Sequence, residues 1–132
     1  MTKVTITLFF ASLFTLHAVA QECPSKTFNN FAYDFMEHTD IQKRFTKNPL
    51  LSSYLVDGAD EVIKKTELIS ARHLKFPLVE NKKLRNDMSY HYAIDTPYVI
   101  RIFTPGTGIQ ILYKFEEFKQ CWRLIEKEDN SM

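Results

Sequence analysis

The sequence predicts an α+β fold in which N-terminal helices pack on one face of a curved antiparallel sheet. A change of hydrophobic period predicts it. Apolar residues recur every three or four positions over residues 28–45, as in amphipathic helices, and every second position from residue 88 onward, as in strands. Helices followed by a run of strands are typical of α+β folds. The length of residues 21–132 suits a single α+β domain.

Residues 1–20 differ from the rest. Lys3 is their only charge, and an apolar run of about a dozen residues then ends at Ala18-Val19-Ala20. This order is typical of a cleavable signal peptide. An uncleaved anchor is the alternative, but a spanning helix needs about 20 predominantly apolar residues, and polar residues interrupt this stretch. We expect cleavage near Ala20, a periplasmic or secreted product, and no membrane span after cleavage.

Charge balance excludes some classes of partner, and the two cysteines predict a disulfide. The chain has 17 Lys and Arg against 16 Asp and Glu, and loss of Lys3 with the leader balances them. Such a balance argues against nucleic acid or an anionic membrane as partner. Cys23 and Cys121 are expected to form a disulfide in an oxidising compartment. A Cys-His nucleophile is the alternative, which would leave one thiol free.

The helical part begins after Ser25, which is expected to cap the first helix. Its apolar stripe consists of Phe28, Phe31, Ala32, Phe35 and Met36. Thr39 and Gln42 fit a capping box for a second, short helix, which Pro49 is expected to stop. Both helices therefore direct an apolar face toward the core.

The middle of the chain is less regular. Asp57-Gly58 predicts a turn, and residues 62–70 fit a short strand or an amphipathic helix equally well. We expect residues 71–87 to be a long connection anchored by Phe76-Pro77-Leu78. Its basic cluster, Lys82, Lys83 and Arg85, is interpreted as a solvated part of that connection.

The final third predicts an antiparallel meander. Its four strands are residues 88–95, 98–104, 109–116 and 121–126. A hairpin loop, Pro105-Gly106-Thr107-Gly108, joins the middle pair, and a tight turn over residues 117–120 precedes the last strand.

The closing segments resemble the last hairpin of nuclear-transport-factor-2-like (NTF2-like, cystatin-like) domains. They are residues 107–115 (TGIQILYKF) and 122–131 (WRLIEKEDNS), and they are most similar to a secreted, uncharacterised bacterial branch of that group. There T-G-I-x-V-x-Y-x-F precedes W-x-L-x-x-x-E-D-x-S. The family hairpin often carries glycine where this chain has Lys119-Gln120-Cys121, which leaves the turn type and the last register open.

The resemblance implies a cone, in which a long helix lies in the concavity of a bent sheet with an apolar pocket at its open end. The candidate pocket residues are Tyr90, Tyr92, Tyr98 and Tyr113. The alternative is that these tyrosines pack by their rings and keep their hydroxyls at the rim. The superfamily includes enzymes, carriers and structural partners, so the fold alone selects no function.

No pattern in the sequence predicts a catalytic residue, a metal site or a cofactor. His91 and Asp95 share a strand face but lie about 13 Å apart at roughly 3.3 Å per residue, too far for a dyad. The histidines are scattered, and the spacings of a zinc site are missing.

Two functions remain open. The first is a non-enzymatic binding protein that acts by protein contact, in one version an immunity protein that neutralises a periplasmic toxin. Its contact surface would be exposed acidic and aromatic side chains at the sheet rim. The second is a small-molecule carrier or an isomerase-type enzyme that uses an aromatic cone pocket.

Overall fold

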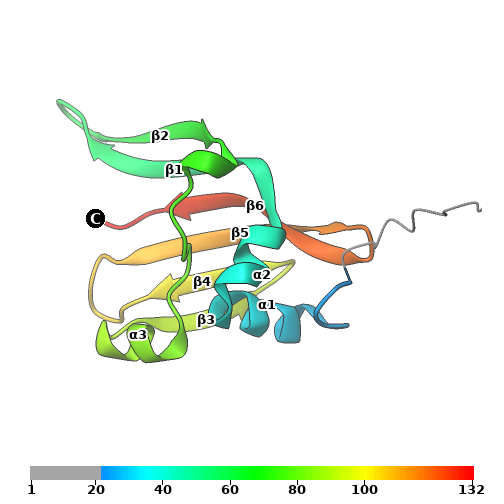
Figure 1. Ribbon diagram of the computed structural model, residues 1–132. Coiled ribbons are helices and arrows are strands. Elements are labelled where there is room, and N and C mark those ends of the chain that lie inside the picture. Colours follow the sequence, from blue (N-terminus) through cyan, green and yellow to red (C-terminus); the bar gives the residue numbers. More distant parts are fainter. Residues whose placement is uncertain (1–21) are drawn as a thin grey trace, which may run out of the picture.

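A computed structural model describes residues 22–132 (Figure 1). The predicted signal peptide, residues 1–20, lies outside the described residues. Within residues 22–132, no helix is long and apolar enough to cross a membrane.

The first helix, α1, spans Phe28–Glu37, and the predicted apolar stripe is buried along its whole length. Its cap differs from the expectation. The hydroxyl oxygen of Thr27 accepts a hydrogen bond from the backbone N–H of Asn30, whereas the Ser25 hydroxyl donates to the Asp34 carboxylate at 2.6 Å. Thr27 therefore takes the capping role predicted for Ser25.

The second helix, α2, spans Thr39–Arg44, and here the predicted capping box is wrong. His38 precedes the helix without a side-chain cap, Thr39 is already helical, and Gln42 is buried. Pro49 does not stop α2 but lies inside the next strand, where the pairing register shifts. Proline has no backbone N–H, so it fits an irregular stretch of a strand.

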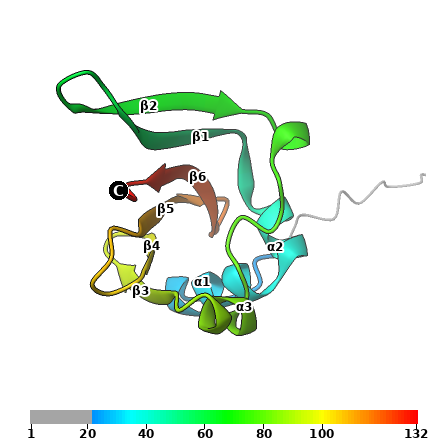
Figure 2. The ribbon, with the colours of Figure 1, turned by 90° about the vertical axis from the view of Figure 1, so that its left-hand side faces the viewer.

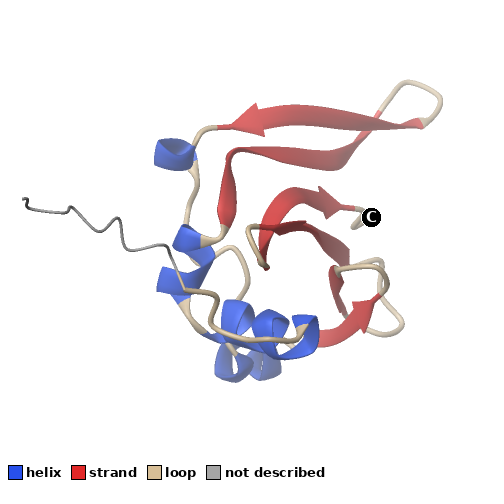
Figure 3. Cartoon of the chain, turned by 90° about the vertical axis from the view of Figure 1, so that its right-hand side faces the viewer, coloured by secondary structure: helices blue, strands red, loops and turns tan. Residues whose placement is uncertain are grey.

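Six strands form one curved, unclosed sheet. They are β1 (Thr46–Asp57), β2 (Val62–Ile69), β3 (His91–Asp95), β4 (Val99–Phe103), β5 (Gln110–Phe118) and β6 (Cys121–Asp129). The spatial order is β2-β1-β6-β5-β4-β3, and Figures 2 and 3 show the sheet curling from β3 round to β2. The predicted meander β3 to β6 is confirmed, and residues 62–70 form a strand. Because β1 runs parallel to β6, the sheet is mixed rather than antiparallel throughout.

The connection between β2 and β3 is more ordered than predicted. It contains a short 3-10 helix, η1 (Ala71–His73), and a helix, α3 (Lys82–Asp87), which the Asn81 side chain caps. Arg85 of α3 is only 2% exposed. The prediction of a solvated basic cluster is therefore wrong for Arg85, whereas Lys82 and Lys83 are exposed. Residues 74–81, which run from η1 to α3, are called the strap below.

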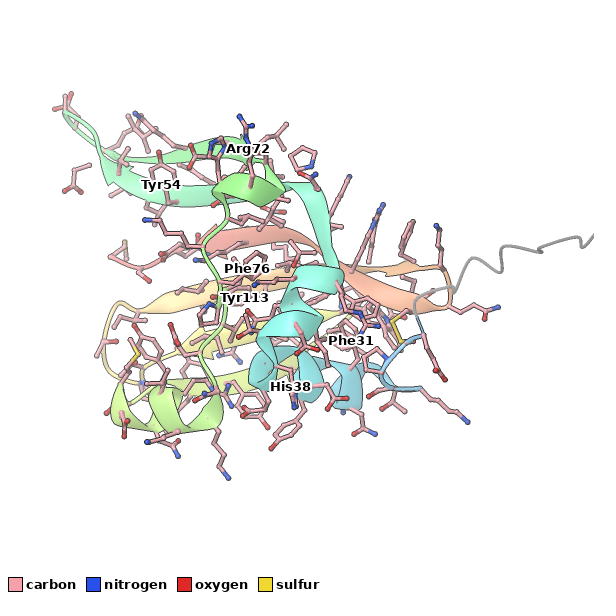
Figure 4. All side chains as sticks on the ribbon, viewed as in Figure 1. Phe31, His38, Tyr54, Arg72, Phe76 and Tyr113 are labelled. Carbon is pink, nitrogen blue, oxygen red and sulfur yellow. A yellow bond between two sulfur atoms is a disulfide. The ribbon has the colours of Figure 1, made fainter. Side chains whose placement is uncertain are left out.

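Aromatic rings join α1 to the sheet. The Phe31 ring lies 5.8 Å from that of Phe115 on β5 and 5.5 Å from that of Trp122 on β6, measured between centroids. Figure 4 shows Phe31 between helix and sheet. The sulfur atoms of Cys23 and Cys121 are 2.18 Å apart, at bonding distance, which ties the segment before α1 to the start of β6.

The β5–β6 turn consists of two residues, Lys119 and Gln120, between the paired Phe118 and Cys121. Their φ angles are 50° and 58°. Two positive φ values are typical of a type I′ hairpin turn, which glycine and asparagine adopt at lower cost than other residues. This settles the turn type that the missing glycine left open.

Gln120→Gly is expected to raise the free energy of unfolding by about 0.5–1 kcal/mol, because relief of the left-handed backbone outweighs the extra entropy of the unfolded chain. Denaturant melts of the oxidised protein measure this. The converse control is Gly106→Ala. Gly106 has a φ of 73° and open space where a Cβ would lie, so that variant should lose about as much. Equal melts for Gln120→Gly and the wild type would contradict the account.

Candidate functional site

The strap is held against the helices by one buried amide, the side chain of Gln42. Its Nε2 donates to the carbonyl oxygens of Phe35 and Val79, each at 2.9 Å. Its Oε1 accepts from the backbone N–H groups of Leu78, at 2.6 Å, and Val79, at 3.3 Å. The amide therefore uses both donors and both acceptor positions. It fixes the middle of the strap to α1 and α2.

Tyr113 holds the strap from the side of the sheet. Its buried hydroxyl donates to the carbonyl oxygen of Leu78 at 2.7 Å. Figure 4 shows Tyr113 on β5 beside the part of the strap that carries Phe76. Burial raises the pKa of the Tyr113 hydroxyl, as do the nearby Asp129 and Glu80 carboxylates. The hydroxyl therefore stays protonated and remains a donor.

Arg85 ties α3 to three other segments. One terminal nitrogen donates to the Glu80 carbonyl at 2.5 Å, and the other lies 2.9 Å from a Glu37 carboxylate oxygen on α1. The guanidinium carbon lies 5.3 Å from the Tyr92 ring centroid on β3. The Glu37 carboxylate also accepts from the backbone N–H of Lys82. A buried charge is tolerated here because it is paired and hydrogen-bonded.

Two hollows border Arg85. The first, of about 220 Å³, lies between the strap, α3 and the sheet, with Leu78, Val79, Met88, Tyr90, Ile102, Ile111, Tyr113 and Lys127 in its wall. The second, of about 280 Å³, lies between α1, α3 and β3. Its wall consists of Tyr33, Lys82, Arg85, Asn86, Tyr90, His91 and Tyr92. Both hollows are open, and Arg85 and Tyr90 belong to both.

The four predicted pocket tyrosines do not share one pocket. Tyr90 borders both hollows, Tyr113 the first and Tyr92 the second. Tyr98 lies apart, with its ring 5.9 Å from that of Trp122 and its hydroxyl bonded to the Glu117 carboxylate. That hydrogen bond raises the pKa of Tyr98. Three of the four predicted tyrosines therefore border a hollow, but the sequence pattern does not show which of these side chains meet.

His91 and Asp95 stay apart, as the strand geometry predicts. His91 borders the second hollow. Asp95 accepts from the Arg101 side chain at 2.8 Å, and this bond lowers the pKa of the Asp95 carboxyl. Over residues 22–132, no three His, Cys, Asp or Glu side chains gather where they could hold a metal ion.

Three acidic side chains of the last two strands form ion pairs with bases: Glu116, Glu126 and Glu128. Glu116 pairs with Arg123 at 2.6 Å, and Glu128 lies 2.5 Å from Lys114 and 3.4 Å from Lys64. The contact surface of acidic and aromatic side chains expected at the rim stays a prediction.

Exposed tyrosines gather with bases instead. Tyr33 and Tyr92 are 47% and 45% exposed on either side of the second hollow. Among the described residues 22–132, no carboxylate lines that hollow. Tyr33 was not predicted as a site residue, because it lies outside the apolar stripe of its helix. Its signal was an aromatic ring on the otherwise polar face. We call Tyr33, Lys82, Asn86, His91 and Tyr92 the α3 face. Its aromatic, amide and cationic groups suit binding.

Gln42→Leu is expected to lower the free energy of unfolding by about 2–4 kcal/mol, because it leaves buried N–H and carbonyl groups of the strap without partners. Denaturant melts at neutral pH measure the loss. The exposed substitution Lys47→Leu serves as control and should stay within about 0.5 kcal/mol of the wild type. If Gln42→Leu were as stable as that control, the Gln42 amide would not be what holds the strap.

Comparison with known proteins finds similarity to solved structures but gives no family assignment. No family model matches the chain, and no curated protein matches it significantly. A solved structure with a similar arrangement is described as an NTF2-like protein from Bacteroides fragilis NCTC 9343. The identity is 16% and the TM-score 0.49, over 85% of this chain and 50% of that chain. The chain thus spans half the length of that protein, and membership of the secreted bacterial branch stays a prediction.

Proposed function

We propose that this protein is a non-enzymatic binding protein of the bacterial cell envelope that recognises an acidic surface of another protein through the α3 face. The observation that carries the proposal is the pair of half-exposed tyrosines, Tyr33 and Tyr92, beside a hollow with basic and amide groups in its wall. Export follows from the predicted leader, and the disulfide pair suits an oxidising compartment.

Protein contact is favoured by the kind of side chain exposed. Tyrosine and arginine are enriched among the residues that dominate binding energy, because they bury a large surface and still offer hydrogen bonds. The Arg85 guanidinium packs against the face of the Tyr92 ring. A ring that is already held in place loses little freedom on binding.

The charge of the α3 face supports an acidic partner. Lys82 and the adjacent Lys83 are exposed, against one exposed carboxylate on the same helix, Asp87. The nearby Glu37 carboxylate is neutralised by Arg85. A basic patch on a chain of balanced charge steers an acidic partner to this side of the molecule. One concrete version is an immunity protein that covers a toxin delivered to the periplasm.

A small-molecule carrier or isomerase-type enzyme is the second candidate. It rests on the curved sheet and the first hollow, where Tyr90 and Tyr113 meet apolar side chains. Two observations weaken it. The space between α1 and the sheet is filled by fully buried Phe31, Phe35 and Leu124, and the Tyr113 hydroxyl already donates to the strap.

Site-specific photocrosslinking in the native host tests the proposal. A benzophenone side chain at position 33 or 92 is expected to cross-link one acidic protein, identified by mass spectrometry. The matched control is position 118, because Phe118 is similarly exposed at 38% but lies at the β5–β6 turn. It should give no such product.

Binding of the purified partner is then expected to weaken about 10- to 100-fold in Tyr92→Ala, a size typical of an interface anchor. Lys82→Glu should also weaken it, and more strongly at low salt. Phe118→Ala should change it less than about twofold. Cross-linking from position 118 alone, or a co-purifying small molecule displaced by substitutions at Tyr90, would contradict the proposal and favour the second candidate.

A further inference from the structure

The edge strand β2 has an exposed and regular outer side. It ends the strand order β2-β1-β6-β5-β4-β3, pairs with β1 over eight residues without a register shift and lies at the outer limit of the molecule in Figures 1 and 2. Leu68 is 67% and Ile63 44% exposed. A long apolar edge of this kind is ordinarily shielded from other strands.

We propose that β2 pairs antiparallel with β2 of a second copy of this chain, so that two sheets join edge to edge about a twofold axis at Thr66. In this register Ile63 lies opposite Ile69 of the second copy. Lys65 lies opposite Glu67 of the second copy. By symmetry each contact occurs twice, and the two threonines meet at the axis.

The backbone allows this register. The Gly58 N–H donates to the Glu61 carbonyl at 2.8 Å, and bonded and non-bonded pairs alternate along an antiparallel ladder. Residues 63, 65, 67 and 69 therefore direct their backbone groups toward β1. Lys64, Thr66 and Leu68 direct theirs outward, where they can bond the same groups of a second copy.

The side chains select the register. Non-bonded pairs bring side chains closest together, and both Lys65–Glu67 and Ile63–Ile69 fall at such positions. A shift of two residues in either direction would set Lys65 against Lys65 or Glu67 against Glu67. Like charges directly opposite one another are unfavourable, so the register centred on Thr66 is the complementary one.

Two charges of β2, Lys65 and Glu67, have no ion-pair partner within residues 22–132. The ion pairs there include Lys64 with Glu128 but none that involves Lys65 or Glu67. Lysines on an edge strand usually discourage pairing. In the proposed dimer Lys65 pairs with the Glu67 carboxylate of the second copy, and the aliphatic part of Lys64 packs on Leu68 of that copy. The lysines therefore favour pairing with this one partner strand.

The dimer is independent of the proposed binding function. It uses β2, at the opposite end of the strand order from β3, and so leaves two α3 faces free. A failure of one proposal therefore leaves the other standing, because neither test uses the other surface.

Charge reversal tests the pairing by analytical ultracentrifugation of protein produced from the full chain, with its disulfide intact. The wild type is expected to dimerise with rising concentration. Lys65→Glu and Glu67→Lys should each weaken self-association about 10-fold or more, since both ion pairs become repulsive. An equimolar mixture of the two variants should recover wild-type association, and so should the double variant.

Lys75→Glu, a charge reversal at an exposed residue of the strap, is the control and should associate like the wild type. Amide exchange of Lys64, Thr66 and Leu68 should slow as the dimer forms. A wild type that stays monomeric up to about 1 mM overturns the proposal. So does a dimer that both single variants leave intact, or variants whose mixture stays monomeric.

Discussion

The structure depends on a single buried amide, the side chain of Gln42. The strap is bonded to α2 through Gln42 and to the sheet through Tyr113. It has no regular secondary structure of its own to satisfy its backbone. Gln42 supplies both donors and both acceptors at that point, to Phe35, Leu78 and Val79. Because an unpaired buried amide is costly, this arrangement fixes one path for the chain.

That path decides where the candidate site forms. Once the strap is fixed, Glu80 meets Arg85, and Arg85 in turn meets Glu37 and Tyr92. The two hollows and the α3 face follow from this chain of contacts rather than from any motif. The proposal that this protein binds another protein rests on that surface.

Much of the fold could be predicted from local patterns, because the spacing of apolar residues shows which side of a helix or strand is buried. The stripe from Phe28 to Met36 and the alternation through residues 109–116 are the two clearest cases. The β1–β6 parallel pair could not be predicted, since no local signal sets which distant strands meet. Gln42 fitted a capping box and Arg85 a solvated cluster for the same reason: their partners lie 36 and 48 residues away in sequence. The candidate site was therefore not predicted, although its aromatic and basic residues can be read from the sequence.

Native-state hydrogen exchange tests the role of the amide most directly. The amide protons of Leu78 and Val79, which donate to the Gln42 side chain, should exchange as slowly as those of the central strands, because both require near-global opening. If they exchanged at the rate of an exposed loop, Gln42 would not fix the strap. The position of the α3 face would then not depend on this amide.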